Sequence, residues 1–481
     1  MKNLLITILI SLACLASADS TSAQLAPFSV SPPGIFRVRP TADLGRGVNF
    51  GNMLEAPNEG DWGLFVEEIF FDRVVDARLE HIRLPVSWTH HAQTNTPYTI
   101  DATFFERVDW VIEQARNHGL KVILNNHHYD QLNSNPLAEK DRALAIWQQI
   151  STRYQSIPDD ELYFEILNEP HDQFNSQPEL WNQFMVDGLE VIRQSNPHRK
   201  VLVGPVFYNS IDSLNTLQLP KDDNLIATVH FYSPFLFTHQ GAEWIDPTPP
   251  IGPTWEGDLF QLTNPLQNWS WGTTLSEGNN GLTINYEDPF SGFQVHNPNG
   301  FTNGQSVTFT VDQALPLKIR VSNNNSGEFE DYFLTTQNGT QSYTIDISSF
   351  GNSNTITNIF LQNNTNGAQP PFLLSQFEIT EGNQSFPIIS TGSDAIRNSF
   401  RSAYLWGLVN NIPVHVGEFG AYQYGDMESR ARWTQAVRVA ADSFKMDWSY
   451  WELGAGFGFY DPNNDSFRLP LLQALVPEFE K

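Results

Sequence analysis

Short apolar runs alternate with amphipathic segments along two stretches of the chain, residues 45–257 and 393–481. The apolar runs predict β-strands at 47–50, 82–86, 122–124, 162–167, 201–203, 226–229, 414–416 and 448–453. Between them, apolar positions recur at helical spacing, which predicts helices at 104–117, 138–154, 180–193, 396–409 and 429–444. Alternation of strands and helices is typical of a parallel α/β sheet, and eight such strands fit a (β/α)8 TIM barrel.

The stretch between the sixth and seventh predicted strands has a different pattern. Residues 265–390 contain 18 Asn and only two basic residues, Lys318 and Arg320. Apolar and polar positions alternate with period two at 306–311, 318–321 and 343–347, and clusters of turn-forming residues separate these runs. This pattern predicts an all-β sandwich inserted into the barrel. The expected organisation is therefore barrel at 24–257, inserted sandwich at 258–392, and barrel again at 393–481.

The first residues of the chain, 1–23, have the pattern of an export signal. Lys2 precedes an apolar run over residues 4–15, and small residues follow that run. The run is too short to span a bilayer, and it contains Cys14, the only cysteine of the chain. Lipid anchoring at Cys14 is the alternative, because the residues before it faintly resemble a lipoprotein box. We expect a secreted protein, extracellular or periplasmic, without cysteine chemistry.

The charge of the chain argues against polyanionic ligands. There are 54 acidic and 27 basic residues, which gives a formal net charge of −27. Such a chain repels phosphate backbones and anionic lipid at long range, so we expect no nucleic-acid or membrane partner. Its 13 Trp, 14 Tyr and 34 Phe supply flat apolar faces that suit the stacking of neutral sugar rings.

Two glutamates end predicted strands on the face where TIM-barrel enzymes carry their active sites. Glu169 lies between Asn168 and Pro170 at the end of the fourth strand, and Glu418 ends the seventh. Two carboxyl groups that face each other across a barrel mouth suit the cleavage of a glycosidic bond, one as proton donor and one as nucleophile. Either glutamate taken alone is equally well explained as an ordinary carboxylate at the rim.

Other strand ends add residues that fit such a site. Arg83 lies in the otherwise apolar second strand; a buried arginine needs a carboxylate, and pairing with Glu418 would keep that group ionised. A structural salt bridge elsewhere is the alternative. His127 and His128 are adjacent at the end of the third strand, so they cannot form a zinc pair of the helical kind; we expect no metal. Trp451 ends the eighth strand, where its indole would form a floor for a sugar ring.

Six motifs follow one another in order at the strand ends: Ile-Arg-Leu-Pro at 82–85, Asn-His-His-Tyr at 126–129, Leu-Asn-Glu-Pro at 167–170, His-Phe-Tyr at 230–232, Gly-Glu-Phe-Gly at 417–420 and Tyr-Trp-Glu at 450–452. Together they resemble glycoside hydrolase family 5, the retaining cellulases and mannanases of the 4/7 clan. Segments 47–63, 237–244 and 417–422 resemble bacterial endoglucanases of the Thermotoga type within that family. The resemblance covers almost all of residues 40–257 and 393–480.

The resemblance implies a role for each matching residue. Glu169 would be the acid/base and Glu418 the nucleophile. The residues that would support them are Arg83, Asn168, His230 and Tyr232. Those that would bind substrate are Asn52, Glu55 and Trp451 on the non-reducing side, His127 and His128 at the subsite of the attached sugar, and Trp244 on the leaving-group side. The family works without a metal or cofactor, so none is expected.

The resemblance therefore implies a retaining endo-β-1,4-glucanase acting on a polysaccharide. A β-mannanase or mixed-linkage β-glucanase is the alternative within the same chemistry, and a non-catalytic glycan-binding protein is the alternative of another class. For Glu169 to act as the acid, burial must raise its pKa, which predicts a bell-shaped pH dependence on the acidic side of neutral.

The insertion resembles a carbohydrate-binding module. The candidate stacking residues are Trp269, Trp271, Tyr286, Phe293, Phe329, Tyr332 and Phe333. A structural domain with those aromatic residues in its core is the alternative. Three acidic residues would either hold calcium or lie solvated in turns: Glu328, Glu330 and Asp331.

Overall fold

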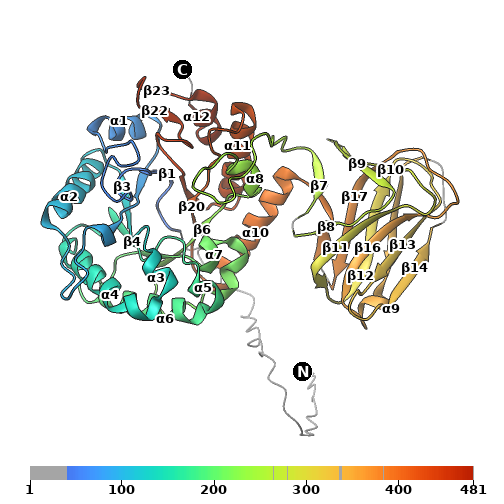
Figure 1. Cartoon of the computed structure of the whole chain (residues 1–481), viewed down its shortest axis with the longest axis horizontal. Coiled ribbons are helices and arrows are strands. Elements are labelled where there is room, and N and C mark those ends of the chain that lie inside the picture. Colours follow the sequence, from blue (N-terminus) through green and yellow to red (C-terminus); the bar gives the residue numbers. More distant parts are fainter. Residues whose placement is uncertain (1–40, 264, 279, 335–338, 383, 480–481) are drawn as a thin grey trace, which may run out of the picture. The chain divides into compact units, whose positions relative to one another are not determined.

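The computed structural model describes residues 41–479 except 264, 279, 335–338 and 383, so the predicted export signal and Cys14 lie outside the described residues. Eight parallel strands form a closed barrel in the order β1 (Arg46–Asn49), β2 (His81–Leu84), β3 (Lys121–Asn125), β4 (Leu162–Glu165), β5 (Val201–Val203), β6 (Leu225–His230), β20 (Val414–Glu418) and β21 (Asp447–Tyr450). Helices ring these strands (Figure 1). The predicted (β/α)8 barrel is confirmed.

The helices of the barrel bury one apolar face each against the strands. In α2, for example, the side chains of Phe105, Val108 and Ile112 are buried, and the Asp101 side chain caps the helix by accepting from the Thr103 N–H. The longer helices are α1 (Glu68–Asp76), α2 (Ala102–Asn117), α4 (Pro136–Arg153), α6 (Pro178–Arg193), α10 (Gly392–Asn410), α11 (Met427–Ser443) and α12 (Leu469–Leu475). The short ones are α3 (Asp130–Ser134), α5 (Gln173–Ser176), α7 (Val206–Asn209), α8 (Phe235–Thr238), and the 3-10 turns at Trp88–His90 and Ile211–Thr216. Among the described residues, no helix combines the length and the apolar character that crossing a bilayer requires.

The insertion interrupts the barrel between its sixth and seventh strands, as predicted. Strand β6 pairs directly with β20, and β20 with β21, so the barrel closes without using the residues between β6 and β20. Two short antiparallel strands, β7 (Phe260–Leu262) and β19 (Ile389–Thr391), pair where the chain enters and leaves the insertion.

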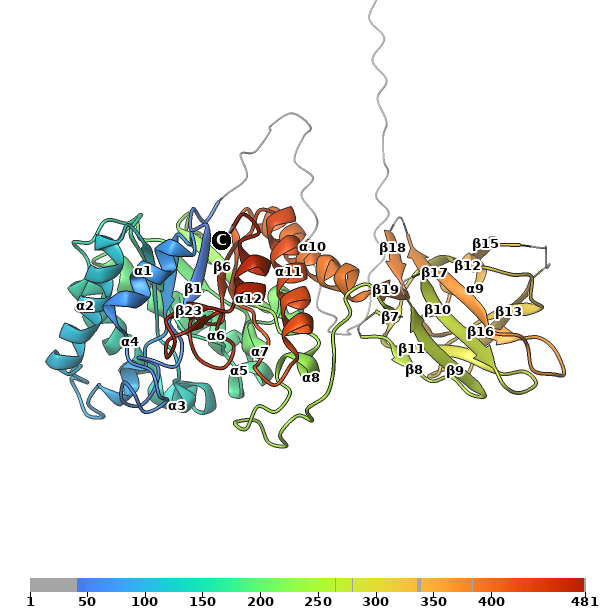
Figure 2. The same ribbon diagram turned by 90° about the horizontal axis from the view of Figure 1, so that it is seen from above.

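The insertion consists of two antiparallel sheets that pack around an apolar core of their own (Figure 2). One sheet has the order β15 (Gln341–Asp346), β12 (Gly304–Val311), β17 (Phe372–Glu381), β10 (Gly281–Tyr286) and β9 (Thr273–Gly278), with β18 (Gln384–Pro387) beside β17. The other has the order β14 (Phe329–Phe333), β13 (Leu317–Ser322), β16 (Ile356–Asn363), β11 (Gly292–Phe301) and β8 (Gln267–Asn268). Alternate side chains such as Phe309, Ile319 and Leu361 fill the space between the sheets. Helix α9 (Ser348–Gly351) covers one end, and a further hairpin, β22 (Tyr460–Asp461) and β23 (Ser466–Phe467), belongs to the barrel part of the chain.

Three of the predicted stacking residues face the core of the sandwich, which corrects the prediction for them. Tyr286 and Phe293 are fully buried in its core, and Tyr332 packs against that core, because their positions on the pleat point inward. Of the two alternatives for the acidic residues of this region, calcium binding is not supported by the positions of Glu330 and Asp331. Both carboxylate oxygens of Asp331 accept from Arg320, and the adjacent Glu330 lies on the opposite side of β14, so these acidic groups do not converge.

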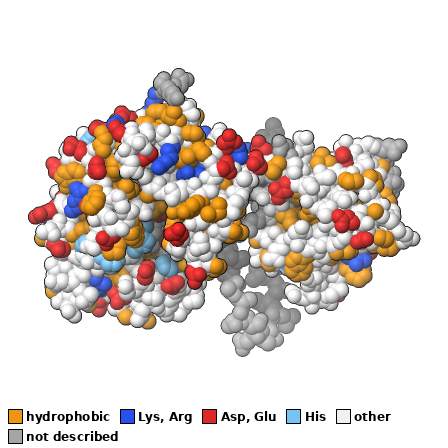
Figure 3. Space-filling model, turned by 45° about the horizontal axis from the view of Figure 1, so that its top comes forward, with side chains coloured by type: hydrophobic (Ala, Val, Ile, Leu, Met, Phe, Trp, Pro, Cys, Tyr) orange, Lys and Arg blue, Asp and Glu red, His pale blue; other side chains and the backbone are white. Residues whose placement is uncertain are grey.

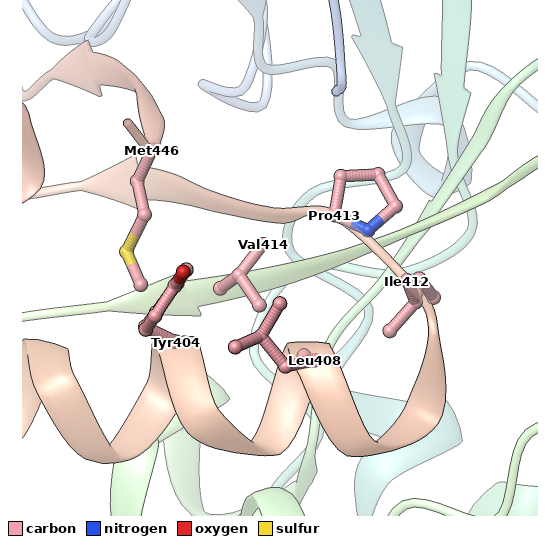
Figure 4. A pocket seen from close by; sticks show the side chains of 7 residues that line it. Tyr404, Leu408, Ile412, Pro413, Val414 and Met446 are labelled. Carbon is pink, nitrogen blue, oxygen red and sulfur yellow. The ribbon is translucent and has the colours of Figure 1, made fainter. Parts of the chain in front are cut away.

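A small apolar hollow lies between α10 and the start of β20 (Figure 4). It is lined by Tyr404, Gly407, Leu408, Ile412, Pro413, Val414 and Met446 and encloses about 10 Å³. That volume is at the lower limit for a single water molecule, and the lining offers a water few polar partners. This hollow is therefore a packing gap at the opposite end of β20 from Glu418.

Candidate active site

Glu169 and Glu418 meet at the barrel mouth. Glu418 is the last residue of β20 and is 4% exposed, whereas the side chain of Glu169, beyond the end of β4, is one quarter exposed. One carboxylate oxygen of each and a ring nitrogen of His230 all lie within 4.8 Å of one another. Histidine side chains gather on one face of the barrel, beside acidic and apolar groups (Figure 3). The two carboxyl groups are thus close enough to act on a single anomeric carbon.

Arg83, on β2, is fully buried and organises the polar side chains beneath the two glutamates. Its Nε and Nη2 donate to the two oxygens of Glu165, each at 2.7 Å. Its Nη1 donates to Glu418 Oε1 and to Asn49 Oδ1, and its Nη2 also donates to Asn168 Oδ1, all at 2.7 Å. The predicted contact between Arg83 and Glu418 is confirmed. The carboxylate that accepts two hydrogen bonds from the guanidinium is, however, that of Glu165.

Glu165 and Asn49 are members of the site that the sequence interpretation misses. Glu165 ends β4 and Asn49 ends β1, and both side chains are fully buried. Asn49 Nδ2 donates to the carbonyl oxygens of Gly417 at 3.0 Å and Tyr450 at 3.2 Å, which ties the ends of β20 and β21 to Arg83. The sequence feature that could have identified Glu165 and Asn49 is the one that identifies Arg83, namely a polar residue in an otherwise apolar strand.

The charges of the site separate the roles of the two glutamates. One guanidinium faces the carboxyl groups of Glu165, Glu418 and Glu169, so ionising all three would leave excess buried negative charge. Burial raises the pKa of Glu169 to about 7. Burial also raises the pKa of Glu418, but the charge of Arg83 and the Tyr232 hydroxyl, which donates to Oε2 at 3.0 Å, oppose that rise. Because Glu418 touches Arg83 and Glu169 does not, the shared proton belongs on Glu169.

His230 links the two carboxyl groups. Its Nδ1 lies 2.7 Å from Glu169 Oε1 and 3.5 Å from Glu418 Oε2. The side-chain amide of Asn209 lies 3.2 Å from Nε2, so both ring nitrogens have a polar partner. Burial lowers the pKa of His230 to about 4, so this ring is neutral near pH 7. The predicted proximity of His230 to Glu169 is confirmed.

Trp451 and His127 form a flat floor beside the catalytic pair. Their rings are nearly parallel, at an interplanar angle of 8° with centroids 5.7 Å apart. The indole lies over Gly51, where a Cβ would come within 3.0 Å of it. His128 is exposed, and its ring meets that of Trp62 edge-on at 5.4 Å. These positions suit the stacking of a sugar ring and leave His128 at the edge of the mouth.

Glu55 does not reach the mouth, which corrects its predicted role in binding sugar. It is 1% exposed, and its carboxylate accepts the backbone N–H groups of Asn52 and Met53, the latter at 2.9 Å. Burial raises the pKa of Glu55 to about 8. Glu55 therefore fixes the turn in which Asn52, half-buried, has a left-handed backbone with φ of 62°.

Trp244 lies beyond α8 and is 59% exposed. Its ring packs edge-on against Tyr422 with centroids 4.8 Å apart, and Phe457 lies 6.2 Å away. Phe457 in turn packs against Tyr232, whose hydroxyl donates to Glu418. An exposed aromatic face is thus connected to the nucleophile through packed rings.

A further aromatic pair, not predicted from the sequence, lies next to Glu169. The rings of His171 and Tyr208 stack at 4.8 Å and 12°, and His171 Nδ1 donates to the Glu169 carbonyl oxygen at 2.6 Å. Tyr208 is 52% exposed. Phe207, Tyr208 and Asn209 all have φ between 57° and 60°, a strained conformation for residues with side chains. Contacts with the surrounding structure must therefore offset the conformational strain of this turn, which lies next to Glu169.

Glu169, His230 and Glu418 are the only cluster of three potential metal-ligating side chains found among the described residues. The oxygens of Glu418 are already used by Arg83 and Tyr232, and a cation there would lie beside a guanidinium. Like-charge repulsion makes this a poor metal site and a better proton-transfer site.

Comparison with known proteins agrees with this geometry. The model of the family described as cellulase, glycosyl hydrolase family 5, matches residues 45–270. Over these residues the barrel is similar to glycosyl hydrolase family 5. Endoglucanase H of Acetivibrio thermocellus is 36% identical over 214 residues, 44% of this chain and 23% of that protein. Endoglucanase B of Ruminococcus albus is 31% identical over 252 residues, 47% of this chain and 60% of that protein. The chain thus spans less than two thirds of either relative.

Solved structures of endoglucanases extend the match around the barrel. One endoglucanase is 28% identical with a TM-score of 0.61, covering 91% of this chain and 98% of its own. Thermotoga maritima Cel5A, solved in complex with mannotriose, is 29% identical with a TM-score of 0.60, covering 90% of this chain and 97% of its own. The same enzyme has been solved with cellobiose. The barrel brings together every predicted catalytic and supporting residue, while the carboxylate of Glu55 is buried and bound by backbone N–H groups.

Proposed function

We propose that this protein is a secreted, retaining glycoside hydrolase that cleaves internal β-1,4 linkages of glucans by double displacement. The observation that carries the proposal is the separation of at most 4.8 Å between one oxygen of Glu169 and one of Glu418. Retaining enzymes hold their carboxyl groups about 5–5.5 Å apart, whereas inverting enzymes need about 6.5–9.5 Å to admit a water. The endoglucanase names of the relatives support the substrate class. Export rests on the pattern of residues 1–23.

In the first step, Glu418 attacks the anomeric carbon while Glu169 gives its proton to the departing glycosidic oxygen. The guanidinium of Arg83 and the hydroxyl of Tyr232 hold the Glu418 carboxylate in place. Asn168 has its amide oxygen bound by Arg83, so its amide N–H groups remain for the sugar hydroxyl next to the reacting carbon. Trp451 supports the ring from one side.

In the second step, water replaces Glu418 on the anomeric carbon. Once Glu418 is esterified its negative charge is gone, so the pKa of Glu169 falls from about 7 and the residue can accept the proton of the water. One carboxyl group thus serves as acid and then as base, which inverts the anomeric carbon twice and restores its configuration.

A defined cello-oligosaccharide tests this mechanism. Proton NMR during hydrolysis should show the β-anomer of the new reducing end first, with the α-anomer appearing only through mutarotation. Initial formation of the α-anomer would contradict double displacement. Product lengths from the same reaction report endo action, because internal cleavage of a hexamer yields trimers and tetramers before glucose accumulates.

A β-mannanase or mixed-linkage β-glucanase is the second candidate. It is favoured by one observation: a relative of 29% identity has been solved with mannotriose as well as with cellobiose. Initial rates on carboxymethyl-cellulose, lichenan and glucomannan, compared at equal enzyme concentration, separate these activities. No turnover of any of the three would leave the non-catalytic glycan-binding alternative. We also propose that the inserted sandwich binds carbohydrate, and the surface concerned is argued next.

A further inference from the structure

The two outward faces of the sandwich differ in chemistry. The sheet built on β12 and β17 presents small polar side chains that bond to one another, such as Thr308 with Thr344 at 3.2 Å and Thr310 with Ser342 at 2.8 Å. The sheet built on β13 and β16 presents aromatic rings, amides and charged groups. We call the outward side of this second sheet the aromatic face. Its described members are Trp269, Trp271, Gln294, His296, Lys318, Arg320, Phe329, Asp331, Phe333, Asn358, Phe360 and Gln362.

Two tryptophans stand at the β8 edge of this face. Trp269 is 45% exposed and stacks on His296, with centroids 3.8 Å apart and an angle of 13°. Trp271 is 40% exposed and meets Phe360 edge-on at 5.9 Å. Its indole lies where a side chain of residue 292 would be, since a Cβ on Gly292 would come 2.3 Å from the ring. Both indoles are therefore held in fixed orientations with one side open.

Two further aromatic side chains stand at the opposite edge, on β14. Phe329 is 57% exposed and Phe333 is 67% exposed. The guanidinium of Arg320 lies 4.2 Å from the Phe329 ring centroid and the ammonium of Lys318 lies 5.9 Å from that of Phe333. Adjacent strands are about 4.8 Å apart, so the five strands place the two aromatic edges about 19 Å from each other.

Polar side chains fill the space between the edges, and they are preorganised. Asp331 accepts from Arg320 at 2.6 and 2.7 Å and from Lys318 at 3.1 Å. On the neighbouring strands, Gln294 Nε2 donates to Asn358 Oδ1 at 3.1 Å. Paired groups of this kind lose little side-chain freedom when they bind a ligand, and each still has unused donors or acceptors.

The charge on the aromatic face selects among ligands. Lys318 and Arg320 are the only basic residues of residues 265–390, and both are held by Asp331, so the face has no strong positive field for a polyanion. Aromatic rings with amides and paired charges between them match a chain of sugars, which offers apolar C–H faces and equatorial hydroxyls. A span of about 19 Å suits an extended chain of several rings.

We propose that the aromatic face is a second glycan-binding site, distinct from the barrel mouth, and that it takes an extended, neutral β-1,4-linked glucan chain. The choice of glucan rests on the function proposed for the barrel, because a face that binds the polymer cleaved at the barrel mouth would keep that polymer close to the active site. The aromatic face and the geometry of its side chains do not depend on that function.

The test uses the full chain with the Glu418→Ala substitution, so that bound polymer is not cleaved. Retardation is measured in native gels cast with and without hydroxyethyl-cellulose, for this protein and for the same protein with Trp269→Ala and Trp271→Ala. Each half-exposed indole removed should weaken binding by about tenfold. The matched control is Thr308→Ala with Thr344→Ala on the other sheet, which should leave retardation unchanged. Phe333→Ala, at the far edge, should weaken binding by a smaller factor.

Two results would overturn the proposal. One is unchanged retardation when both indoles are removed, with thermal unfolding showing an intact sandwich. The other is a change in sedimentation coefficient instead of glucan binding, which would make the aromatic face a contact between copies of the chain. In the catalytically intact chain, the double tryptophan variant should keep its kcat/KM on an aryl cellobioside. Tryptophan-dependent binding without any hydrolysis would support the aromatic face while refuting the function proposed for the barrel.

Discussion

The barrel mouth and the aromatic face both expose rings beside polar groups, but they treat charge in different ways. At the mouth, Arg83 and Glu165 are completely buried, and the desolvated carboxyl groups above them have raised pKa values. On the aromatic face, Arg320 and Asp331 are paired near solvent, with side chains 29% and 18% exposed, and the pKa of Asp331 is lowered chiefly by its hydrogen bond to Arg320. Buried charge supports proton transfer, whereas solvated, paired charge supports adhesion.

The largest expected effect is on turnover at the barrel mouth. Glu418→Gln keeps the shape of the side chain but removes the nucleophile, so kcat on a soluble β-glucan should fall by about 10⁴-fold or more. Release of reducing ends measures this. An unchanged unfolding temperature would show that the loss is chemical, and activity above a tenth of the original would refute the assignment.

The next effect is on stability, and it contrasts a buried ion pair with an exposed one. Glu165→Gln leaves Arg83 without its two-point partner, so the barrel should lose about 3–5 kcal/mol of unfolding free energy. The control is Asp109→Asn, which breaks the exposed pair with Arg153 and should cost less than about 1 kcal/mol. Denaturant unfolding of the barrel transition measures both. Equal losses of unfolding free energy would mean that the buried pair of Arg83 and Glu165 contributes no more to stability than the exposed pair.

The third effect is on the pH dependence of activity. The pKa of Glu169, raised by burial to about 7, must exceed the pH for the acid to hold its proton, so activity should fall about tenfold per unit above pH 7. At low pH, protonation of Glu418 should lower activity, which gives a bell-shaped profile. With an aryl glycoside whose leaving group needs no proton, Glu169→Gln should remove the alkaline limb of kcat/KM. An alkaline limb that persists in this variant would assign the acid elsewhere.

The smallest effect concerns single rings. Trp451→Ala should lower kcat/KM on a soluble cello-oligosaccharide by about tenfold, because one stacking surface for the sugar is lost. The same substitution at Trp269, in the sandwich, should leave that value unchanged while it weakens retention on polymeric glucan. If both substitutions lowered kcat/KM equally, the claim that the barrel mouth and the aromatic face are independent sites would be refuted.

Much of the site can be predicted from the sequence because strand periodicity and position are local properties. The run before Asn168 and Glu169 predicts a strand that ends at the mouth, and the same holds for Glu418. What local pattern cannot give is the partner of a buried group. The sequence shows that a buried Arg83 needs a carboxylate partner, but it does not show which one. In the structure, Glu165 accepts two hydrogen bonds from the guanidinium, and Glu418 accepts one.

Orientation is the second property that local pattern leaves open. Glu55 follows the first strand as a substrate-binding residue would, yet backbone N–H groups capture its carboxylate. In the sandwich, Tyr286 and Phe293 are aromatic like Trp269 and Trp271, but the register of the two sheets turns the first pair into the core. A one-residue change of register would reverse this assignment.

The sequence by itself determined the alternation of strands and helices, the place of the insertion, and the two glutamates at strand ends, since each follows from apolar spacing along a short segment. Only the tertiary structure decided which polar groups share one guanidinium, which carboxyl group carries the proton, and which sheet presents its rings to solvent. Those outcomes depend on distances and burial between segments remote in the chain, where desolvation and Coulomb interactions act.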